Sequence, residues 1–286
     1  MPILEMKESQ SNIKSNKILV FIPIYNCENQ IIRVLQQFQD NKIDSSLVHT
    51  ILICNNHSTD NSQKNALLKL REIDTAINKI VILNKKNYGL GGSHKVAFKF
   101  AIDNGFTHVI VLHGDDQGSI ENILPLIKNG DHLLYDCLLG ARFHNKSILV
   151  GYSKLRTFGN RVFNFLFSLL TGEKLYDLGA GLNIYSTSIL KDNFFFRFPD
   201  NLTFNYCMII AHVFYKHNFF FFPISWREDD QISNVKLFSQ AKSVLKMLLA
   251  YRINPRKFLK SEHRNIIHNE YIGDIVNVED NTNEAV

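Results

Sequence analysis

The sequence predicts an α/β fold with a mostly parallel central sheet and helices on both of its faces. Two observations support this prediction. The first half of the chain alternates four times between a short apolar run and a more polar segment, and helical spacing of apolar residues follows the early runs. Each apolar run also ends in a polar or glycine-containing stretch. Strands that alternate with helices pair in parallel through helical crossovers, so this order indicates a doubly wound sheet.

Four buried strands are expected in the first half, since the apolar runs are short and rich in β-branched residues. They lie at residues 17–23, 50–54, 80–83 and 109–112. Between them, apolar residues recur on one helical face at residues 31–38, after the Ser58-Thr59-Asp60 cap, and at 93–104.

The second half is less regular. Strands are expected at residues 136–141, 180–185 and 219–226, and helices at 154–170, 204–216 and 235–253. The resulting organisation is a disordered N-terminus, one α/β domain, an amphipathic helical extension and a flexible tail, at residues 1–16, 17–240, 241–261 and 262–286.

Composition narrows the class of protein. The net charge of +5 is only mildly basic, which argues against a dedicated nucleic-acid binder and suits a phosphate-bearing substrate or an anionic membrane surface. The four cysteines lie far apart, so they form neither a zinc motif nor a disulfide framework. The N-terminal stretch lacks the apolar core of a signal peptide, and the apolar runs are too short to cross a bilayer. We therefore expect a cytoplasmic protein.

The end of the fourth strand is the strongest candidate for a site. His113, Asp115 and Gln117 alternate along the chain, so in an extended segment they point to one side. An imidazole, a carboxylate and an amide oxygen can together hold a divalent cation. The alternative interpretation is an ordinary Gly-Asp-Asp turn beside a histidine whose hydrogen bonds are satisfied.

The first two strands also end in side chains that suit a ligand. After the first, Tyr25 can stack on a base, and Asn26 can hydrogen-bond the base or the ribose. Asn55 occupies the equivalent place after the second strand. Taken alone, these stretches also fit a plain strand-to-helix turn and a capped helix start.

A glycine loop at residues 87–92 follows the third strand. Gly89 and Gly91 would let the backbone approach a ligand, and Lys95 beside a helix N-terminus favours phosphate. The loop is not the dinucleotide-binding fingerprint, because it follows the third strand and lacks the third glycine at the required spacing.

Taken together, these four strand ends resemble glycosyltransferase family 2, with its GT-A (Rossmann-like) fold, over roughly residues 17–240. The chain looks most like the branch of dolichol- or polyprenyl-phosphate sugar synthases. Later motifs that carry this resemblance are Gly140-Ala141-Arg142, Gly151-Tyr152 followed by Arg156, Asp177 to Asn183, and Trp226-Arg227 followed by Ser233 and Lys236.

The resemblance implies an inverting transfer of a sugar from a nucleotide-diphosphate sugar to a polyprenyl-phosphate or glycan acceptor, in surface polysaccharide or glycolipid synthesis. It implies a divalent metal, Mn²⁺ or Mg²⁺, on Asp115, His113 and Gln117, and a protein that is cytoplasmic or peripheral on the inner face of the membrane. Asp177 would act as the general base or would orient the acceptor, and Arg156 would bind the acceptor. The nucleotide sugar would contact Pro23, Tyr25, Asn26, Asn55, Gly89, Gly91, Lys95, Asp115, Arg142, Arg227 and Lys236.

Three departures from the family pattern keep other functions open. His113 replaces the first acid of the metal motif and favours a softer metal such as Mn²⁺, Asn55 replaces a base-reading aspartate, and Cys27 replaces a common glutamate. One alternative is an inactive module that binds nucleotide or glycan. Another is a nucleotidyltransferase, although the basic glycine-rich loop expected after its first strand is missing. A metal-dependent phosphoesterase would need further histidine and aspartate clusters.

Overall fold

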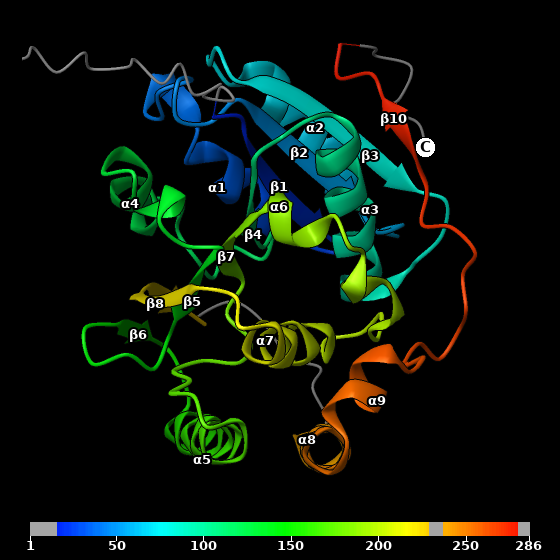
Figure 1. The fold of residues 1–286 in the computed structure, drawn as a ribbon. Coiled ribbons are helices and arrows are strands. Elements are labelled where there is room, and N and C mark those ends of the chain that lie inside the picture. Colours follow the sequence, from blue (N-terminus) through cyan, green and yellow to red (C-terminus); the bar gives the residue numbers. More distant parts are fainter. Residues whose placement is uncertain (1–15, 229–236, 280–286) are drawn as a thin grey trace, which may run out of the picture.

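Within the residues that the computed structural model describes, 16–228 and 237–279, an eight-stranded sheet forms the centre of the fold (Figure 1). Its strand order is β10-β3-β2-β1-β4-β7-β5-β8. The strands are β1 (Ile18–Ile24), β2 (Thr50–Asn55), β3 (Asn78–Asn84), β4 (His108–Leu112), β5 (Cys137–Ala141), β7 (Leu182–Ser186), β8 (Phe219–Pro223) and β10 (Gly273–Val276).

The predicted α/β fold is confirmed. Strands β3, β2, β1 and β4 are mutually parallel, β5 pairs in parallel with β8, and β7 and β10 run antiparallel to their neighbours. Parallel neighbours bring the carboxyl ends of the first four strands to one edge of the sheet. That edge is where the sequence predicts the site.

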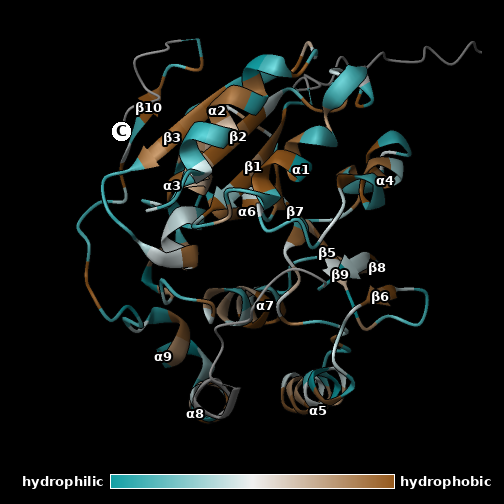
Figure 2. Ribbon diagram, turned by 180° about the vertical axis from the view of Figure 1, so that it is seen from behind, coloured by the Kyte–Doolittle hydropathy of each residue, from teal (hydrophilic) through white to brown (hydrophobic). Residues whose placement is uncertain are grey.

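Helices cover both faces of the sheet because its strands are apolar on both sides (Figure 2). Ile18, Val20 and Ile22 pack in one buried cluster with α1 (Gln30–Gln36), α2 (Ser62–Glu72) and α4 (Leu124–Lys128). Leu19 and Phe21 point to the other face, where the cluster includes residues of α3 (Gly89–Asp103), α6 (Thr187–Leu190) and α7 (Phe204–Tyr215).

Three further helices lie beyond α7, on the side away from the parallel strands (Figures 1 and 2). They are α5 (Lys154–Thr171), α8 (Leu237–Ile253) and α9 (Pro255–Lys260), and α5 packs against α8. A separate pair of short parallel strands joins β6 (Ile148–Val150) to β9 (Ser225–Arg227). Short 3₁₀ turns complete the path: η1 (Gln39–Asn41), η2 (Ile120–Asn122), η3 (Asp131–Leu133) and η4 (Phe194–Arg197).

Two expectations need correction here. The strand expected at 219–226 is divided, because β8 ends at Pro223 and the chain then joins β6 as β9. The tail expected to be flexible from residue 262 contains β10, which pairs with β3, and a buried Tyr271. Its short Gly-Asp-Ile-Val strand carries too little apolar pattern to be recognised alone. The N-terminal residues 1–15 lie outside the described residues, and the division at residue 240 stays a prediction.

A buried histidine makes the fold sensitive to acid. His212 is fully buried against Tyr185, and this burial lowers its pKa from 6.5 to about 3. Between these two values the unfolded chain binds a proton that the folded chain excludes, so stability falls as the pH drops below 6.5. When the pH falls from 7 to 5, the unfolding free energy should drop in the wild type and drop by about 2 kcal/mol less in His212→Phe. Urea unfolding at both pH values measures this difference. His57→Asn removes an exposed imidazole at a left-handed position that asparagine tolerates, and it is the control. Equal losses in all three proteins would contradict the prediction.

Candidate active site

Each of the four parallel strands is followed by a residue with left-handed backbone. These residues are Asn26, His57, Gly89 and Asp116, with φ of 48°, 63°, 76° and 60°. Such backbone is uncommon for residues with a Cβ and tends to cluster at functional sites. Their position at one sheet edge supports the location that the sequence predicts for the site.

The loop after β4 lies directly against β1. Gly114 donates its backbone N–H to the carbonyl of Pro23 at 3.1 Å, and a Cβ at Gly114 would lie 2.5 Å from Ile24 Cγ2. Glycine is therefore required for this approach. Pro23, which was predicted to contact the nucleotide sugar, is buried, and its carbonyl accepts the hydrogen bond that holds this loop.

The alternation predicted along this loop is present. His113, Asp115 and Gln117 are partly exposed, whereas the residues between them are buried. His113 Nδ1 lies 4.0 Å from Asp115 Oδ2. All three predicted metal ligands are therefore at least partly accessible, and His113 and Asp115 lie near each other.

The imidazole of His113 is suited to metal binding. Burial, with a smaller contribution from the positive charge of Arg142, lowers its pKa to about 4, so it is neutral at pH 7. Its Nε2 is buried and has no hydrogen-bond partner among the described residues. The ring lies on Gly181, where a Cβ would come within 2.6 Å of His113 Cγ. The residues present therefore fit a borderline metal with mixed nitrogen and oxygen ligands.

Within residues 16–228 and 237–279, no three His, Cys, Asp or Glu side chains form a group that could hold a metal. A cation at this loop would therefore need the Gln117 amide and oxygens of a bound ligand in addition to His113 and Asp115.

Asp116, which the sequence interpretation left without a role, joins two arginines beside this loop. Its side chain is buried and forms ion pairs with Arg33, whose Nε lies 2.5 Å from Oδ2, and with Arg227. Arg227 also donates from Nε to the carbonyl of Asp116 at 2.9 Å and from its backbone N–H to that of Gln117 at 3.0 Å. The structure thus brings the predicted Arg227 to the loop at residues 113–118, which we call the metal loop after its predicted ligands. Lys236 lies outside the described residues.

Asp177, predicted to be the general base or to orient the acceptor, is the partner of Arg142. The guanidinium binds it at two points, Nε to Oδ2 and Nη2 to Oδ1, both at 2.8 Å. Backbone N–H groups of Arg142 and Gly179 also donate to this carboxylate, which is 2% exposed. Because four donors occupy its two oxygens, this arrangement favours the positioning role predicted for Asp177 over the role of a general base.

Arg142 itself lies among aromatic rings. Its guanidinium carbon is 5.2 Å from the ring centres of both Phe143 and Trp226, and Trp226 also contacts Gly118 of the metal loop. Arg156, predicted to bind the acceptor, forms an ion pair with Glu228 and lies over the ring of Tyr152. These two arginines extend the positive side of the site toward α5.

The loops after β1 and β2 are hydrogen-bonded to each other. Asn26 donates from its backbone to Ser58 Oγ at 3.1 Å and accepts from the backbone N–H of Thr59 at 2.8 Å. Tyr25 is 49% exposed, as the predicted stacking on a base requires. Asn55 is only 1% exposed, and Ser58 and Gln63 bind its amide. Its predicted contact with a nucleotide is therefore corrected: it fixes the loop shape.

The glycines after β3 pack against protein and not against open space. Helix α3 begins at Gly89, so Gly91 lies inside the helix. A Cβ at Gly89 or Gly91 would come within 2.4 Å of the carbonyl oxygens of Asp200 or Pro199. The predicted ligand contacts of both glycines are wrong in this structure, because segment 199–200 already occupies that space.

The prediction that Lys95 binds phosphate is also wrong. Its side chain is fully buried, and Nζ donates to Asp200 Oδ1 and to the carbonyl of Phe198, both at 2.6 Å. Tyr271, from the C-terminal segment, is a third partner at 3.2 Å. Burial lowers the pKa of Lys95 to about 8, although Asp200 opposes this shift. Lys95 therefore joins α3 to two later segments of the fold.

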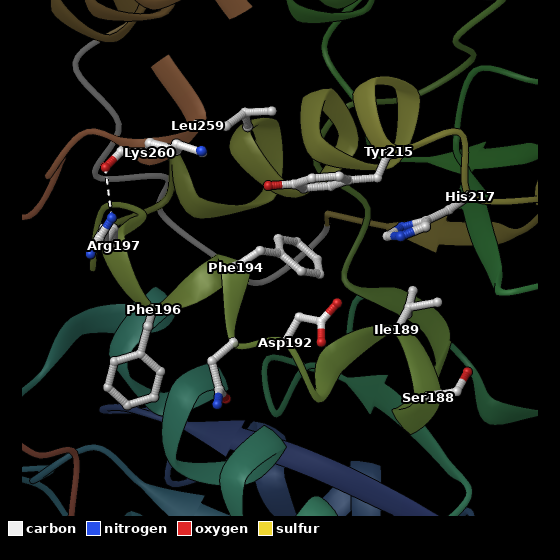
Figure 3. A pocket seen from close by; sticks show the side chains of 11 residues that line it. Ser188, Ile189, Asp192, Phe194, Phe196, Arg197, Tyr215, His217, Leu259 and Lys260 are labelled. Carbon is white, nitrogen blue, oxygen red and sulfur yellow. Dashed lines mark hydrogen bonds between the residues drawn. The ribbon is translucent and has the colours of Figure 1, made fainter. Parts of the chain in front are cut away.

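A cavity of about 650 Å³ lies apart from these residues, around α6, η4 and the end of α7 (Figure 3). Asp192 and Lys260 contribute charges to its lining, and Phe194 and Tyr215 contribute rings. Since α6 follows β7, which runs antiparallel to β4, this cavity lies at the opposite edge of the sheet. None of the predicted site residues lines it.

A match over most of the α/β domain decides the family. The family model described as "Glycosyl transferase family 2" matches residues 19–194, which is more than half of the chain. The chain belongs to glycosyltransferase family 2. The match spans β1 to β7 and includes the metal loop, Arg142 and Asp177, so the resemblance seen in the motifs is confirmed.

Curated relatives are similar at low identity. A UDP-N-acetylglucosamine–dolichyl-phosphate N-acetylglucosaminyltransferase of Methanococcus voltae is 26% identical over 185 residues, covering 61% of this chain and 71% of the relative. A dodecaprenyl-phosphate galacturonate synthase of Rhizobium johnstonii is 26% identical over 180 residues, covering 63% of this chain and 50% of the relative. Both agree with the resemblance to the polyprenyl-phosphate branch.

Solved structures share the fold. Glucosyl-3-phosphoglycerate synthase from Mycobacterium tuberculosis, in complex with Mn²⁺, uridine diphosphate and phosphoglyceric acid, superposes with a TM-score of 0.58 at 12% identity. The match covers 84% of this chain and 79% of that one. This family 2 glycosyltransferase therefore has the GT-A fold that the sequence predicts. Across the described ranges, no helix is both long enough and apolar enough to cross a membrane.

Proposed function

We propose that the chain transfers a sugar from a uridine-diphosphate sugar to a polyprenyl phosphate, with inversion at the anomeric carbon. The metal loop carries this proposal, because His113, Asp115 and Gln117 are all partly exposed, His113 lies near Asp115, and Arg227 is bonded to the same loop. The named activities of the two curated relatives support a lipid-phosphate acceptor, and one of those names includes a UDP-sugar donor.

Asp115, His113 and Gln117 would hold the divalent cation, and the neutral imidazole favours Mn²⁺ over Mg²⁺. When bound, the cation neutralises charge that develops on the departing diphosphate. Arg227 adds a fixed positive charge on the same side of the loop. Tyr25 would stack on the base, and Asn26 with Ser58 would shape the ribose side.

The state of Asp177 favours a phosphate acceptor over a glycan hydroxyl. A phosphate oxygen is already an anionic nucleophile at pH 7, whereas a sugar hydroxyl needs a base. Asp177 would have to release the Arg142 guanidinium before it could act as that base. Arg142 and Arg156 would then serve to bind the acceptor phosphate and the donor sugar.

Helix α5 contacts the protein through a face that carries both apolar and polar side chains: Phe167 is fully buried there, and neighbouring polar side chains form hydrogen bonds. Asn160 donates to Tyr152 Oη, Asn164 donates to the carbonyl of Tyr176, and Ser168 accepts from the backbone of Leu175. Its exposed side carries an apolar stripe in which side chains are 40–75% exposed: Leu155, Phe158, Val162, Phe165 and Leu169. A contiguous exposed stripe of this kind marks a surface that binds an apolar partner.

The charges around this stripe favour a membrane surface as its partner. Neither α5 nor the neighbouring α8 contains an aspartate or glutamate, whereas Lys154, Arg161, Lys246 and Arg252 are exposed on them. Helix α8 exposes further apolar side chains, Leu245, Leu249 and Ile253. Apolar residues with basic neighbours suit a helix that lies in the interface of an anionic bilayer. We therefore propose peripheral contact with the inner face of the membrane, where a polyprenyl phosphate would be presented.

Flotation with vesicles tests this contact. We expect the wild type to float with vesicles that contain anionic lipid, and Phe158→Asp to lose most of that binding because its charge would enter the bilayer interface. Leu134→Asp, which changes a 68% exposed leucine outside α5 and α8, is the matched control and should float like the wild type. Equal flotation of both variants, or none by the wild type at low salt, would contradict the proposed contact.

The activity is tested with UDP-sugars and a polyprenyl phosphate in the presence of Mn²⁺. We expect one UDP-sugar to yield a lipid-linked sugar and free UDP. Binding of nucleotide without turnover would support the inactive module, and release of pyrophosphate from a nucleoside triphosphate would support a nucleotidyltransferase. Either result would contradict the proposed function.

A further inference from the structure

Asp116 is held between two guanidinium groups at the edge of the metal loop. Its carboxylate is buried and pairs with Arg33 from α1 and with Arg227 from β9. Its neighbour Asp115 is partly exposed, and its Oδ2 lies 4.0 Å from His113 Nδ1. The two adjacent acids therefore have different surroundings. Asp115 lies beside the predicted metal ligand His113, and Asp116 pairs with the two arginines.

The backbone of Asp116 is part of the same contact. Asp116 has left-handed backbone, with φ of 60°. In this conformation both its carbonyl and its carboxylate contact Arg227. The Arg227 backbone N–H is bonded in addition to the carbonyl of Gln117. An arginine side chain held at two points, Nε and Nη2, has lost most of the freedom that an unbound exposed arginine would keep.

We propose that Asp116 is a positioning residue that presets Arg227 for the diphosphate of the sugar donor. This inference rests on the proposed function, because it assigns the leaving diphosphate to the side of the loop that Arg227 faces. Arg227 is 40% exposed, so it is accessible while it is held. A preset cation stabilises developing negative charge without first having to reorganise.

The alternative role for Asp116 is purely structural, as the link between α1 and the metal loop. Arg33→Gln removes that link while leaving the contacts between Asp116 and Arg227. It is therefore the matched control for Asp116→Asn. Asparagine suits left-handed backbone, so this variant changes mainly the charge.

A double-mutant cycle on the affinity for pyrophosphate with Mn²⁺, measured by calorimetry, tests the inference. Pyrophosphate avoids any dependence on the base. We expect Asp116→Asn to weaken binding about 10-fold, Arg227→Ala to weaken it at least as much, and the double variant to match Arg227→Ala. Arg33→Gln should stay within about twofold of the wild type.

Two results would overturn the inference while the proposed function stands. One is wild-type affinity in Asp116→Asn. The other is an undiminished effect of Asp116→Asn in the Arg227→Ala background, which would mean that Asp116 acts on the cation or on the fold. Failure of the wild type to bind pyrophosphate with Mn²⁺ would overturn the proposed function and this inference together.

Discussion

Replacing Asp115 with asparagine is expected to lower kcat/KM for sugar transfer by about 10³-fold. Asp115 is the carboxylate on the accessible side of the metal loop, and the leaving diphosphate depends on the charge of the cation that it would hold. An amide of the same shape keeps the turn but loses the negative charge. The measurement is initial-rate kinetics with Mn²⁺ at saturating acceptor.

Asp103→Asn provides the matched control, since it removes a carboxylate from an exposed pair with Lys99 on α3. It should retain wild-type rates. The melting temperature without metal should be similar in both variants, because Asp115 is partly exposed. Full activity of Asp115→Asn would remove the metal loop from the mechanism.

The second large effect is expected at the pair of Arg142 and Asp177. Both side chains are almost fully buried, and breaking a buried ion pair leaves an uncompensated charge. We expect Arg142→Met and Asp177→Asn each to lower the unfolding free energy by about 3 kcal/mol and kcat/KM by about 100-fold. Chemical denaturation and steady-state kinetics on the same samples measure both quantities.

The double variant separates positioning from base catalysis. If Asp177 acts by placing Arg142, the double variant should be about as slow as either single one, since both remove the same arrangement. If Asp177 were the base, Asp177→Asn should cost much more activity than Arg142→Met, and the losses should combine. That outcome would restore the role that the sequence first suggested.

The fold was largely predictable because the spacing of apolar residues along the chain shows which faces of its helices and strands are buried. The first four strands and the helices between them have alternating or fully apolar patterns, and the structure places them as expected. Elements with a weak pattern were not recognised. Strand β10 is a short edge strand whose stability comes from pairing with β3, and no local signal records that pairing.

Exposure was predictable where it alternates along the chain, as at His113, Asp115 and Gln117, whose role as metal ligands stays a prediction. The role of a side chain was not predictable where the same chemistry suits both a ligand and another residue of the protein. Lys95 and Asp177 both fit the expected chemistry, yet distant residues such as Asp200 and Arg142 bind them. The role of Asp116 could not be predicted for the same reason, because its partners Arg33 and Arg227 lie 83 and 111 residues away in the sequence.

The central claim is a metal-dependent nucleotide-sugar site at the carboxyl ends of β1 to β4. Its most direct test is a thermal-shift panel of nucleoside diphosphates and their sugars, each with Mn²⁺, with Mg²⁺ and with chelator. We expect uridine diphosphate and one UDP-sugar to raise the melting temperature with metal, more with Mn²⁺ than with Mg²⁺, and not with chelator. No shift across the panel in folded protein, or the same shift with chelator, would contradict the claim.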